Sequence, residues 1–257
     1  MDYEQFKAAV FKLTSIDLSA YKEKQMRRRI DTLINKHKID GYENFVATLK
    51  SDKDVFEEFV SYLTINVSEF YRNPDQWELM DKEYIPELIK KFGKNLKIWS
   101  AACSTGDEPY SLVMALSRHI PLNQIRITAT DIDKQIIAQA KTGLYAEKSL
   151  TGIPKDLKEK YFTKVGTNSY QISDEIKSRV TFQQHNLLKD KYPDNVHFIV
   201  CRNVLIYFTE EAKEEVFVKF NKALAKGGLL FIGSTEQIMN HKEIGYERRN
   251  SFYYEKP

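Results

Sequence analysis

Residues 98–112 constrain this chain of 257 residues more than any other segment, and they read Ile-Trp-Ser-Ala-Ala-Cys-Ser-Thr-Gly-Asp-Glu-Pro-Tyr-Ser-Leu. The order predicts a buried strand, a turn of small residues and a helix that begins near Pro109, because proline fits the first helical turn. Small residues such as Ser104 and Gly106 let a ligand approach the backbone closely. We therefore expect a nucleotide-cofactor site at the end of this strand.

Two adjacent acids, Asp107 and Glu108, stand in that turn. Carboxylates that face a ligand argue against a bound phosphate, and the chain has neither a Walker Gly-Lys-Ser/Thr sequence nor a complete Gly-x-Gly-x-x-Gly sequence. The ligand should instead carry positive charge or hydroxyl groups. S-adenosylmethionine has both, in its ammonium and sulfonium groups and its ribose diol, and it is the predicted cofactor.

A second strand and turn support this prediction. Residues 125–130 have the composition of a strand and lead into Asp131 and Asp133, ahead of a helical run at 134–141. An acidic residue at the tip of such a strand is where a doubly wound sheet holds an adenosine ribose. Aspartate is also a common helix cap, so capping is the alternative for either residue. We expect Asp131 to bind the ribose and Asp133 to cap the helix.

Polar residues follow two further predicted strands, and ligands of open α/β sheets lie outside such carboxyl ends. Asn186 and Leu187, after the third strand, are placed to hydrogen-bond and sandwich an adenine. After the fourth strand, Asn203 is placed to bind the methionine end and Tyr207 to face the transferred methyl group. Each position alone is weak support, because asparagine at a strand end often only builds a turn.

The order of elements predicts an α/β fold. Beyond the first helices the chain alternates between strands and helices, which implies a parallel sheet, and residues 245–254 are typical of a hairpin at one side. The expected helices are 3–14, 18–36, 42–50, 54–63 and about 74–92, and the expected strands are 96–100, 126–130, 179–184, 196–201 and 228–233.

One segment, between residues 143 and 179, does not fit the alternation. Residues 161–164 and 170–173 flank a turn at 166–169, which is typical of a hairpin inserted into the crossover of the sheet. Such an insertion can serve as a recognition platform. The alternative is a surface excursion without a role of its own.

The apolar runs, the first residues and the cysteines indicate in which compartment the protein is expected. No apolar run approaches membrane-spanning length, and the first residues lack a signal peptide pattern. The two cysteines, Cys103 and Cys201, have no metal-ligand spacing and suggest a reducing compartment. We expect a soluble cytoplasmic protein without a metal, in which both cysteines pack beside the site and form neither a disulfide nor a nucleophile.

The net charge of +3 gives nucleic-acid binding no support, but residues 20–38 are strongly basic. Their spacing predicts a helix that buries an apolar stripe and lines one solvent face with charge. A solvated face and a docking face for an acidic partner are both open interpretations. The basic residues are Lys22, Lys24, Arg27, Arg28, Arg29, Lys36 and Lys38.

Five motifs in order resemble the chemotaxis receptor glutamate methyltransferases, the CheR family, over nearly the whole chain. They lie at residues 64–72, 99–110, 129–133, 186–188 and 201–208. The resemblance implies a class I S-adenosylmethionine-dependent methyltransferase domain over 76–257, with a doubly wound, mostly parallel sheet. It also implies a small all-helical N-terminal domain and linker over 1–75, and an inserted β-subdomain at about 143–180 that helps to dock the receptor.

The resemblance implies roles for single residues as well. Asn66, Ser68 and Arg72 would reach the cofactor from the linker between the domains, and Arg72 and Tyr207 would flank the reacting centre as the catalytic pair. Glu108 would bind the methionine amino end and Asp131 the ribose. The adenine region would lie against Asn186 and Leu187, and the remaining wall would be formed by Arg202 and Asn203.

Two departures from the family pattern are informative. Members commonly have glutamate where this chain has Asp107, a change that keeps the charge. Members that tether to a receptor's C-terminal pentapeptide carry a longer glycine-rich loop than residues 165–170. We therefore expect the short-loop, pentapeptide-independent type, whose affinity for receptors would come from Arg27, Arg28 and Arg29.

The expected chemistry is one of positioning. A substrate glutamate has an ordinary pKa of about 4.3 and is already ionised at neutral pH, so no general base is needed. In-line alignment would be the main task, with Arg72 orienting the carboxylate and Tyr207 donating a hydrogen bond. The expected product is S-adenosylhomocysteine. The expected partners are the cytoplasmic helices of membrane chemotaxis receptors, to whose arrays a monomeric protein is recruited without inserting into the membrane.

Two other functions remain as alternatives. A catalytically inactive adaptor would lose the cofactor residues, all of which are present. A nucleic-acid methyltransferase acting on exocyclic amines would show Asn/Asp-Pro-Pro-Tyr after the fourth strand, where residues 202–205 read Arg-Asn-Val-Leu. We therefore expect no nucleic-acid partner.

Overall fold

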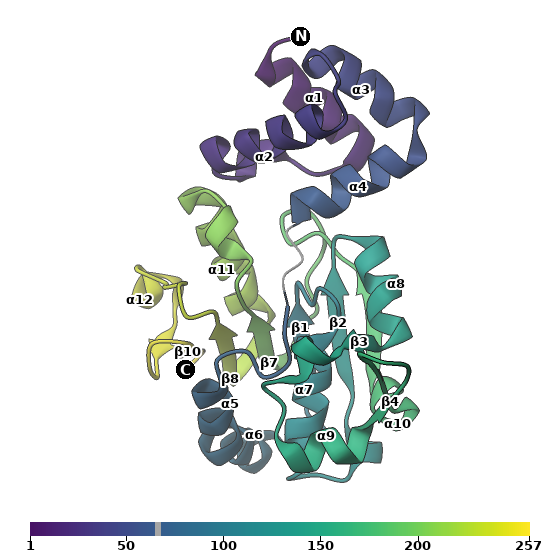
Figure 1. Ribbon diagram of the computed structural model, residues 1–257. Helices are drawn as coiled ribbons and strands as arrows, with labels where there is room; N and C mark the ends of the chain where they lie inside the picture. Colours follow the sequence, from purple (N-terminus) through teal and green to yellow (C-terminus); the bar gives the residue numbers. More distant parts are fainter. Residues whose placement is uncertain (65–67) are drawn as a thin grey trace. The chain divides into compact units, whose positions relative to one another are not determined.

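A computed structural model describes residues 1–64 and 68–257 (Figure 1). The described residues form two compact units: one contains 1–64 and 204–215, and the other contains 68–203 and 216–257. Residues 68–75, expected in the linker, therefore pack with the sheet. Residues 204–215, expected in the sheet domain, pack with the N-terminal helices. No helix among the described residues is long and apolar enough to cross a bilayer.

The first unit is built on four helices, α1 (Tyr3–Thr14), α2 (Glu23–Lys36), α3 (Gly41–Ser51) and α4 (Lys53–Thr64). Asp2 and Gln5 form a capping box that begins α1. Each helix buries one apolar face, and the aromatic centre of this small core includes Phe6, Phe45 and Phe59, all fully buried. The four helices confirm the expected ones to within one residue, except at the start of the second.

The predicted helix 18–36 is wrong at its beginning. A short 3₁₀ turn, Leu18–Ala20, is followed by a break, and α2 starts only at Glu23. The break arises because backbone groups of residues 20 and 22 form hydrogen bonds with the segment around Tyr207 and not within a helix. The Lys22 N–H donates to the Tyr207 carbonyl at 2.9 Å, and the Thr209 N–H donates to the Ala20 carbonyl at 2.9 Å. A tertiary contact from far along the chain thus overrides the helical spacing.

The second unit is a seven-stranded sheet in the order β6-β2-β1-β7-β8-β10-β9. The first five strands are parallel, and the C-terminal hairpin adds two antiparallel ones, as expected. The five parallel strands match the predicted ones to within two residues at each end, except that β8 begins four residues earlier. They are β1 (Ile98–Ala101), β2 (Ile127–Asp131), β6 (Val180–Gln184), β7 (Val196–Cys201), β8 (Leu224–Ile232), β9 (Glu247–Arg248) and β10 (Tyr253–Glu255).

Helices pack against this sheet and cover its apolar residues. All four residues of β1 are buried, as is typical of a parallel strand with helices on both faces. Contacts with the strands are made by α7 on β2 and β6, by α8 on the same two strands, and by α6 on β7. The helices of this unit are α6 (Ile85–Phe92), α7 (Asp107–Leu116), α8 (Lys134–Thr142), α10 (Asp174–Lys177), α12 (His241–Ile244) and residues 216–223 of α11 (Glu210–Ala223).

The predicted helix 74–92 is interrupted. It consists of α5 (Pro74–Leu79), a π-helical turn at Met80–Tyr84, and α6. Pro86 supplies the physical reason: proline lacks an N–H, and its ring clashes with the carbonyl four residues earlier in an α-helix. Widening to a π turn relieves that clash without ending the helix.

The inserted hairpin is confirmed and gains a third strand. A small antiparallel sheet has the order β3-β5-β4, where β3 is Leu144–Ala146, β4 is Phe162–Lys164 and β5 is Ser169–Ile172. The turn between β4 and β5 is short and closes with a hydrogen bond from the Val165 N–H to the Ser169 carbonyl at 2.8 Å. A helix, α9 (Lys155–Tyr161), completes the insertion.

Asp133 caps α8, with its Oδ1 accepting the N–H groups of Gln135 at 2.8 Å and Ile136 at 3.3 Å. Asp133→Ala removes this acceptor and is expected to lower the free energy of unfolding by about 1 kcal/mol. Asp133→Ser keeps a capping oxygen and should lose less. Urea unfolding of the three proteins measures the effect, and equal losses in both variants would contradict the capping role.

Candidate functional site

The carboxyl ends of β6, β2, β1, β7 and β8 lie side by side in the sheet, and the loops that leave them form the candidate site. Unusual backbone conformations gather there. Ala102, Ser104 and Asn203 have φ values of 63°, 49° and 61°, in the left-handed region that residues with a Cβ seldom adopt. Such conformations persist only where surrounding contacts hold them, and they are common at ligand sites.

The loop after β1 is fixed to the end of β2. The Cys103 N–H donates to the Thr130 carbonyl at 2.9 Å, and the Ser104 N–H donates to Asp131 Oδ2 at 2.9 Å. Gly106 has a φ of 88°, and a Cβ there would lie 3.0 Å from atoms of both Ala140 and Tyr110. Glycine is therefore required at the turn, because Ala140 and Tyr110 pack closely against it.

Asp131 is only 5% exposed at the tip of β2. Its second oxygen, Oδ1, accepts the Asp133 N–H at 3.1 Å, and burial raises the pKa of the carboxyl to about 6. Each carboxylate oxygen retains a lone pair beyond its backbone hydrogen bond, so the group is able to accept from hydroxyls as well. Asp131 thus lies in a loop junction, while Asp133 carries the helix cap.

Glu108 is a second carboxyl of the site whose pKa is strongly raised. Ser100 Oγ donates to Glu108 Oε1 at 2.8 Å. Burial raises the pKa of Glu108 to about 7, although the charges of Arg202 and Arg72 and the Ser100 hydroxyl act to lower it. A carboxyl in this state is stabilised as an anion by any further cation that reaches it.

Asp107 points to a different neighbourhood from Glu108. It is 1% exposed, it accepts hydrogen bonds from the hydroxyls of Thr105 and Ser68, and burial raises its pKa. Asp107 therefore ties the turn to the linker segment. Ser68, which the family resemblance directs to the cofactor, contacts Asp107 in the structure.

Arg202 is buried and anchors the segment that carries Arg72. Its Nη2 donates to the Arg72 carbonyl at 2.8 Å and to Asn73 Oδ1 at 2.9 Å, and its guanidinium lies 4.6 Å from the centre of the Phe231 ring. Burial lowers the pKa of Arg202, and Arg72 is among the charges that act on Glu108. The structure thus brings Arg72, Arg202 and Glu108 together.

Asn203 follows Arg202, and its backbone N–H donates to Glu236 Oε2 at 3.0 Å. Its side-chain Oδ1 is buried without a hydrogen-bond partner among the described residues, and so is Ser104 Oγ. Buried polar atoms normally have partners, so unsatisfied ones at a strand-end site fit a polar ligand such as S-adenosylmethionine. No sequence motif marks Glu236, because Asn203 lies on another loop, far away in sequence.

The loop after β6 holds Asn186 and Leu187. Asn186 Oδ1 accepts the Leu188 N–H at 2.9 Å, which is the turn-building role that we gave as the alternative. Leu187 is 7% exposed, and the His185 N–H donates to the Asp131 carbonyl at 2.8 Å. A backbone hydrogen bond therefore joins this loop to Asp131, the residue predicted to bind the ribose.

The structure assigns two further sets of predicted residues to the first unit, and it does not describe a third. Asn66 lies outside the described residues. Tyr207 ends a 3₁₀ turn, Leu205–Tyr207, that belongs to the first unit. Arg27, Arg28 and Arg29 lie on α2, in that same unit.

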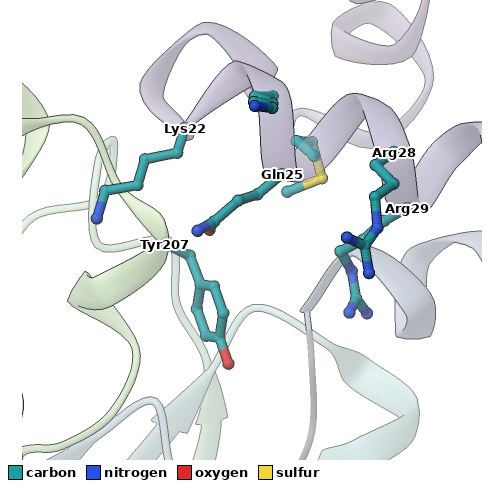
Figure 2. A pocket seen from close by; sticks show the side chains of 7 residues that line it. Lys22, Gln25, Arg28, Arg29 and Tyr207 are labelled. Atoms are coloured by element: carbon teal, nitrogen blue, oxygen red, sulfur yellow. The ribbon is translucent and has the colours of Figure 1, made fainter.

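A recess of about 550 Å³ lies between α2 and the Tyr207 segment (Figure 2). Figure 2 shows Gln25 extending from α2 toward Tyr207, whose hydroxyl points away from the helix. The recess is strongly basic. Its lining residues are Lys22, Lys24, Gln25, Met26, Arg28, Arg29 and Tyr207.

The expectation that the basic residues of 20–38 all line one solvent face is wrong for Arg29. This side chain is half-buried, donates to the Tyr62 carbonyl and lies 4.5 Å from the centre of the Tyr62 ring. Arg27 is exposed but lies 5.1 Å from the Tyr3 ring centre. Arg28 is exposed and lines the recess.

The cysteines pack as expected. Cys103 and Cys201 are both free and buried at the ends of β1 and β7. Burial raises the pKa of each thiol well above its ordinary value, which disfavours the nucleophilic thiolate. Among residues 1–64 and 68–257, no cluster of His, Cys, Asp and Glu is arranged to hold a metal ion.

Two family models match the chain. Residues 66–251 match the family described as "CheR methyltransferase, SAM binding domain", and residues 1–64 match "CheR methyltransferase, all-alpha domain". The chain belongs to the CheR methyltransferase family. The resemblance inferred from the five motifs is confirmed, as is the class I methyltransferase fold with an all-helical N-terminal domain.

Relatives of the CheR family match nearly end to end. The chain is 40% identical to the chemotaxis protein methyltransferase of Listeria monocytogenes, over 98% of this chain and 96% of that one. It is 32% identical to chemotaxis protein methyltransferase 1 of Pseudomonas aeruginosa (93% and 91%) and 31% identical to the chemotaxis protein methyltransferase of Borreliella burgdorferi (92% and 88%). The CheR match assigns the strand-end cluster to a SAM-binding domain.

The raised pKa of Glu108 has a consequence for stability. Its ordinary value of 4.5 rises to about 7 on folding, so the ligand-free protein is fully stable with respect to this group below pH 4.5 and loses stability as the pH rises to about 7. Glu108→Gln removes the charge. It should raise the free energy of unfolding of the ligand-free protein by about 1–2 kcal/mol at pH 8 and leave it nearly unchanged at pH 4.5.

Urea unfolding of Glu108→Gln and the parent protein at the two pH values measures this difference. Glu255→Gln is a matched control, because Glu255 is also mostly buried but pairs with Lys91 and Arg249 on the hairpin side of the sheet. Destabilisation by Glu108→Gln at pH 8 would contradict the assignment.

Proposed function

We propose that this family member is a protein-glutamate O-methyltransferase that transfers a methyl group from S-adenosylmethionine to glutamate side chains of chemotaxis receptors, for sensory adaptation. The observation that carries the proposal is a pair of carboxyls with raised pKa in a chain of the CheR family: half-buried Glu108, in the first turn of α7 beside β1, and buried Asp131, at the tip of the adjacent strand β2. One suits a cation and the other a diol, and S-adenosylmethionine presents both.

The cofactor fits the strand-end cluster as follows. Glu108 pairs with the ammonium of the methionine end, and Asp131 accepts the ribose hydroxyls, since charge-assisted hydrogen bonds are the stronger ones. Asn203 presents its buried Oδ1 toward the methionine end. Asn186 and Leu187 lie beside the adenine, and Asn66 and Ser68 reach the site from the linker, as the family resemblance implies.

The transfer step is an in-line displacement. A carboxylate oxygen of the substrate glutamate attacks the methyl carbon, the carbon–sulfur bond breaks, and its electron pair stays on sulfur. A methyl ester and neutral S-adenosylhomocysteine result. The nucleophile is already ionised at neutral pH, so alignment of the three atoms does the catalytic work and no metal is needed.

Arg72 is proposed to orient the substrate carboxylate. Its backbone carbonyl accepts from Arg202 and from Trp77 Nε1 at 3.0 Å, which fixes the residue at the strand edge. Both the carboxylate and the sulfonium lose their charge in the reaction, so too strong an ion pair with the substrate would slow the step. Tyr207 donates a hydrogen bond to the same carboxylate, a role that rests on the family resemblance.

The recess on α2 is proposed as the receptor-docking surface. Lys22, Lys24 and Arg28 offer positive charge to the acidic face of receptor helices around the methylated glutamates, whereas Arg29 mainly holds α4. The short turn between β4 and β5 supports a pentapeptide-independent type. We propose a monomer that acts in the cytoplasm at receptor arrays, with no nucleic-acid partner.

The activity is tested with methyl-labelled S-adenosylmethionine, receptor-containing membranes and total RNA. Label should enter receptor bands as carboxyl methyl esters, which alkali hydrolyses with release of volatile methanol. Arg72→Ala should reduce the transfer rate at least about 10-fold while changing the melting temperature little, because orientation contributes several kcal/mol to such reactions. Label in RNA, or alkali-stable label in protein, would contradict the proposal.

Docking through charge predicts a reversal phenotype. Lys24→Glu with Arg28→Glu should raise the Michaelis constant for receptor at least about 10-fold, leave cofactor affinity unchanged, and be mimicked in the parent protein by high salt. Lys50→Glu, on the exposed side of α3, is the matched control. An unchanged Michaelis constant for receptor in the double variant would show that docking occurs elsewhere.

A further inference from the structure

Glu236 is a buried acid that neither the sequence motifs nor the proposed chemistry uses. It follows β8 and is only 4% exposed. Its Oε2 accepts the Gly233 N–H at 2.7 Å and the Asn203 N–H at 3.0 Å. A single carboxylate oxygen therefore joins the loop after β8 to the residue that follows β7.

The contact leaves no spare room. A Cβ at Gly233 would lie 2.7 Å from Glu236 Oε2, 2.8 Å from the Asn203 N and 2.9 Å from Asn203 Nδ2. Distances below 3.0 Å are not tolerated between such atoms, so glycine is needed for the carboxylate to reach both N–H groups. We refer to Gly233, Glu236 and the Asn203 backbone as the Glu236 clamp.

The clamp acts on a residue in a disfavoured conformation. Asn203 has a φ of 61°, which costs free energy for a residue with a Cβ, although asparagine tolerates it better than most. A hydrogen bond from its N–H to a carboxylate is stronger than one to a neutral acceptor and offsets this cost. The same conformation sets the side chain, with Nδ2 against Gly233 and Oδ1 buried without a partner among the described residues.

We propose that Glu236 is a positioning residue for the cofactor: it holds Asn203 in the left-handed conformation that presents Oδ1 to the methionine end of S-adenosylmethionine. Glu236 acts through Asn203 and does not contact the cofactor. The inference rests on the role proposed above for Asn203.

A double-mutant cycle tests the inference, with calorimetric dissociation constants for S-adenosylmethionine and melting temperatures as readouts. Glu236→Ala and Asn203→Ala should each weaken binding about 10-fold, the size expected for one hydrogen bond to a polar group. Glu236→Ala should weaken it no further in the Asn203→Ala background. The fall in melting temperature caused by Glu236→Ala should persist there, which separates positioning from stability.

Two further variants sharpen the result. Glu236→Gln keeps an acceptor oxygen for both N–H groups and should bind within about threefold of the parent protein. Binding as weak as that of Glu236→Ala would show that the negative charge of Glu236, and not the position of its oxygen, supports the affinity. Glu236→Asp shortens the side chain and should bind weakly even if Glu236→Ala fails to fold. Glu255→Ala is the control that lowers the melting temperature without changing affinity.

The outcomes separate the two claims. Normal affinity in Asn203→Ala would overturn the proposed role of Asn203. Weak binding in Asn203→Ala together with normal binding in both Glu236→Ala and Glu236→Asp would overturn the positioning role of Glu236 alone. An additive 10-fold loss in the double variant would show that Glu236 acts by another route.

Discussion

Burial of the Glu108 carboxyl beside β1 is the interaction on which the rest of the site depends. Its cost is expressed in a pKa of about 7 in place of 4.5, even though Ser100 donates to the carboxyl and Arg202 and Arg72 favour its ionised form. A cationic ligand that reaches Glu108 reduces that cost, so binding recovers stability that the ligand-free fold gives up.

Two anchors keep the surrounding loops in place. Asp131 receives the Ser104 N–H and so locks the loop after β1 onto the tip of β2. Arg202 donates hydrogen bonds to the Arg72 carbonyl and to Asn73 Oδ1, and so holds the segment that carries Arg72. A charged residue at a cofactor site thus serves mainly to position backbone, and the chemistry proposed for Arg72 depends on it.

Much of this could be predicted from the sequence, because the signals are local. The strands of the sheet alternate with helices, and the position of Asp131 at the tip of β2 and the helix cap at Asp133 both follow from local sequence patterns. The failures involve tertiary contacts or steric effects. The Tyr207 segment breaks the helix expected at 18–36, and Pro86 widens the helix expected at 74–92. Glu236 contacts Asn203 on another loop, and no local pattern predicts that contact.

The most direct test of the central claim is proton release when S-adenosylmethionine binds. Calorimetry at pH 6.5 in two buffers of different ionisation enthalpy measures it, at a pH where an α-amino group is fully protonated. With a pKa of about 7, Glu108 is mostly protonated there and must lose its proton to pair with the ammonium. The parent protein should release more than half a proton, and Glu108→Gln should release about that much less and bind at least about 10-fold more weakly. Equal proton release and equal affinity in the two proteins would contradict the account.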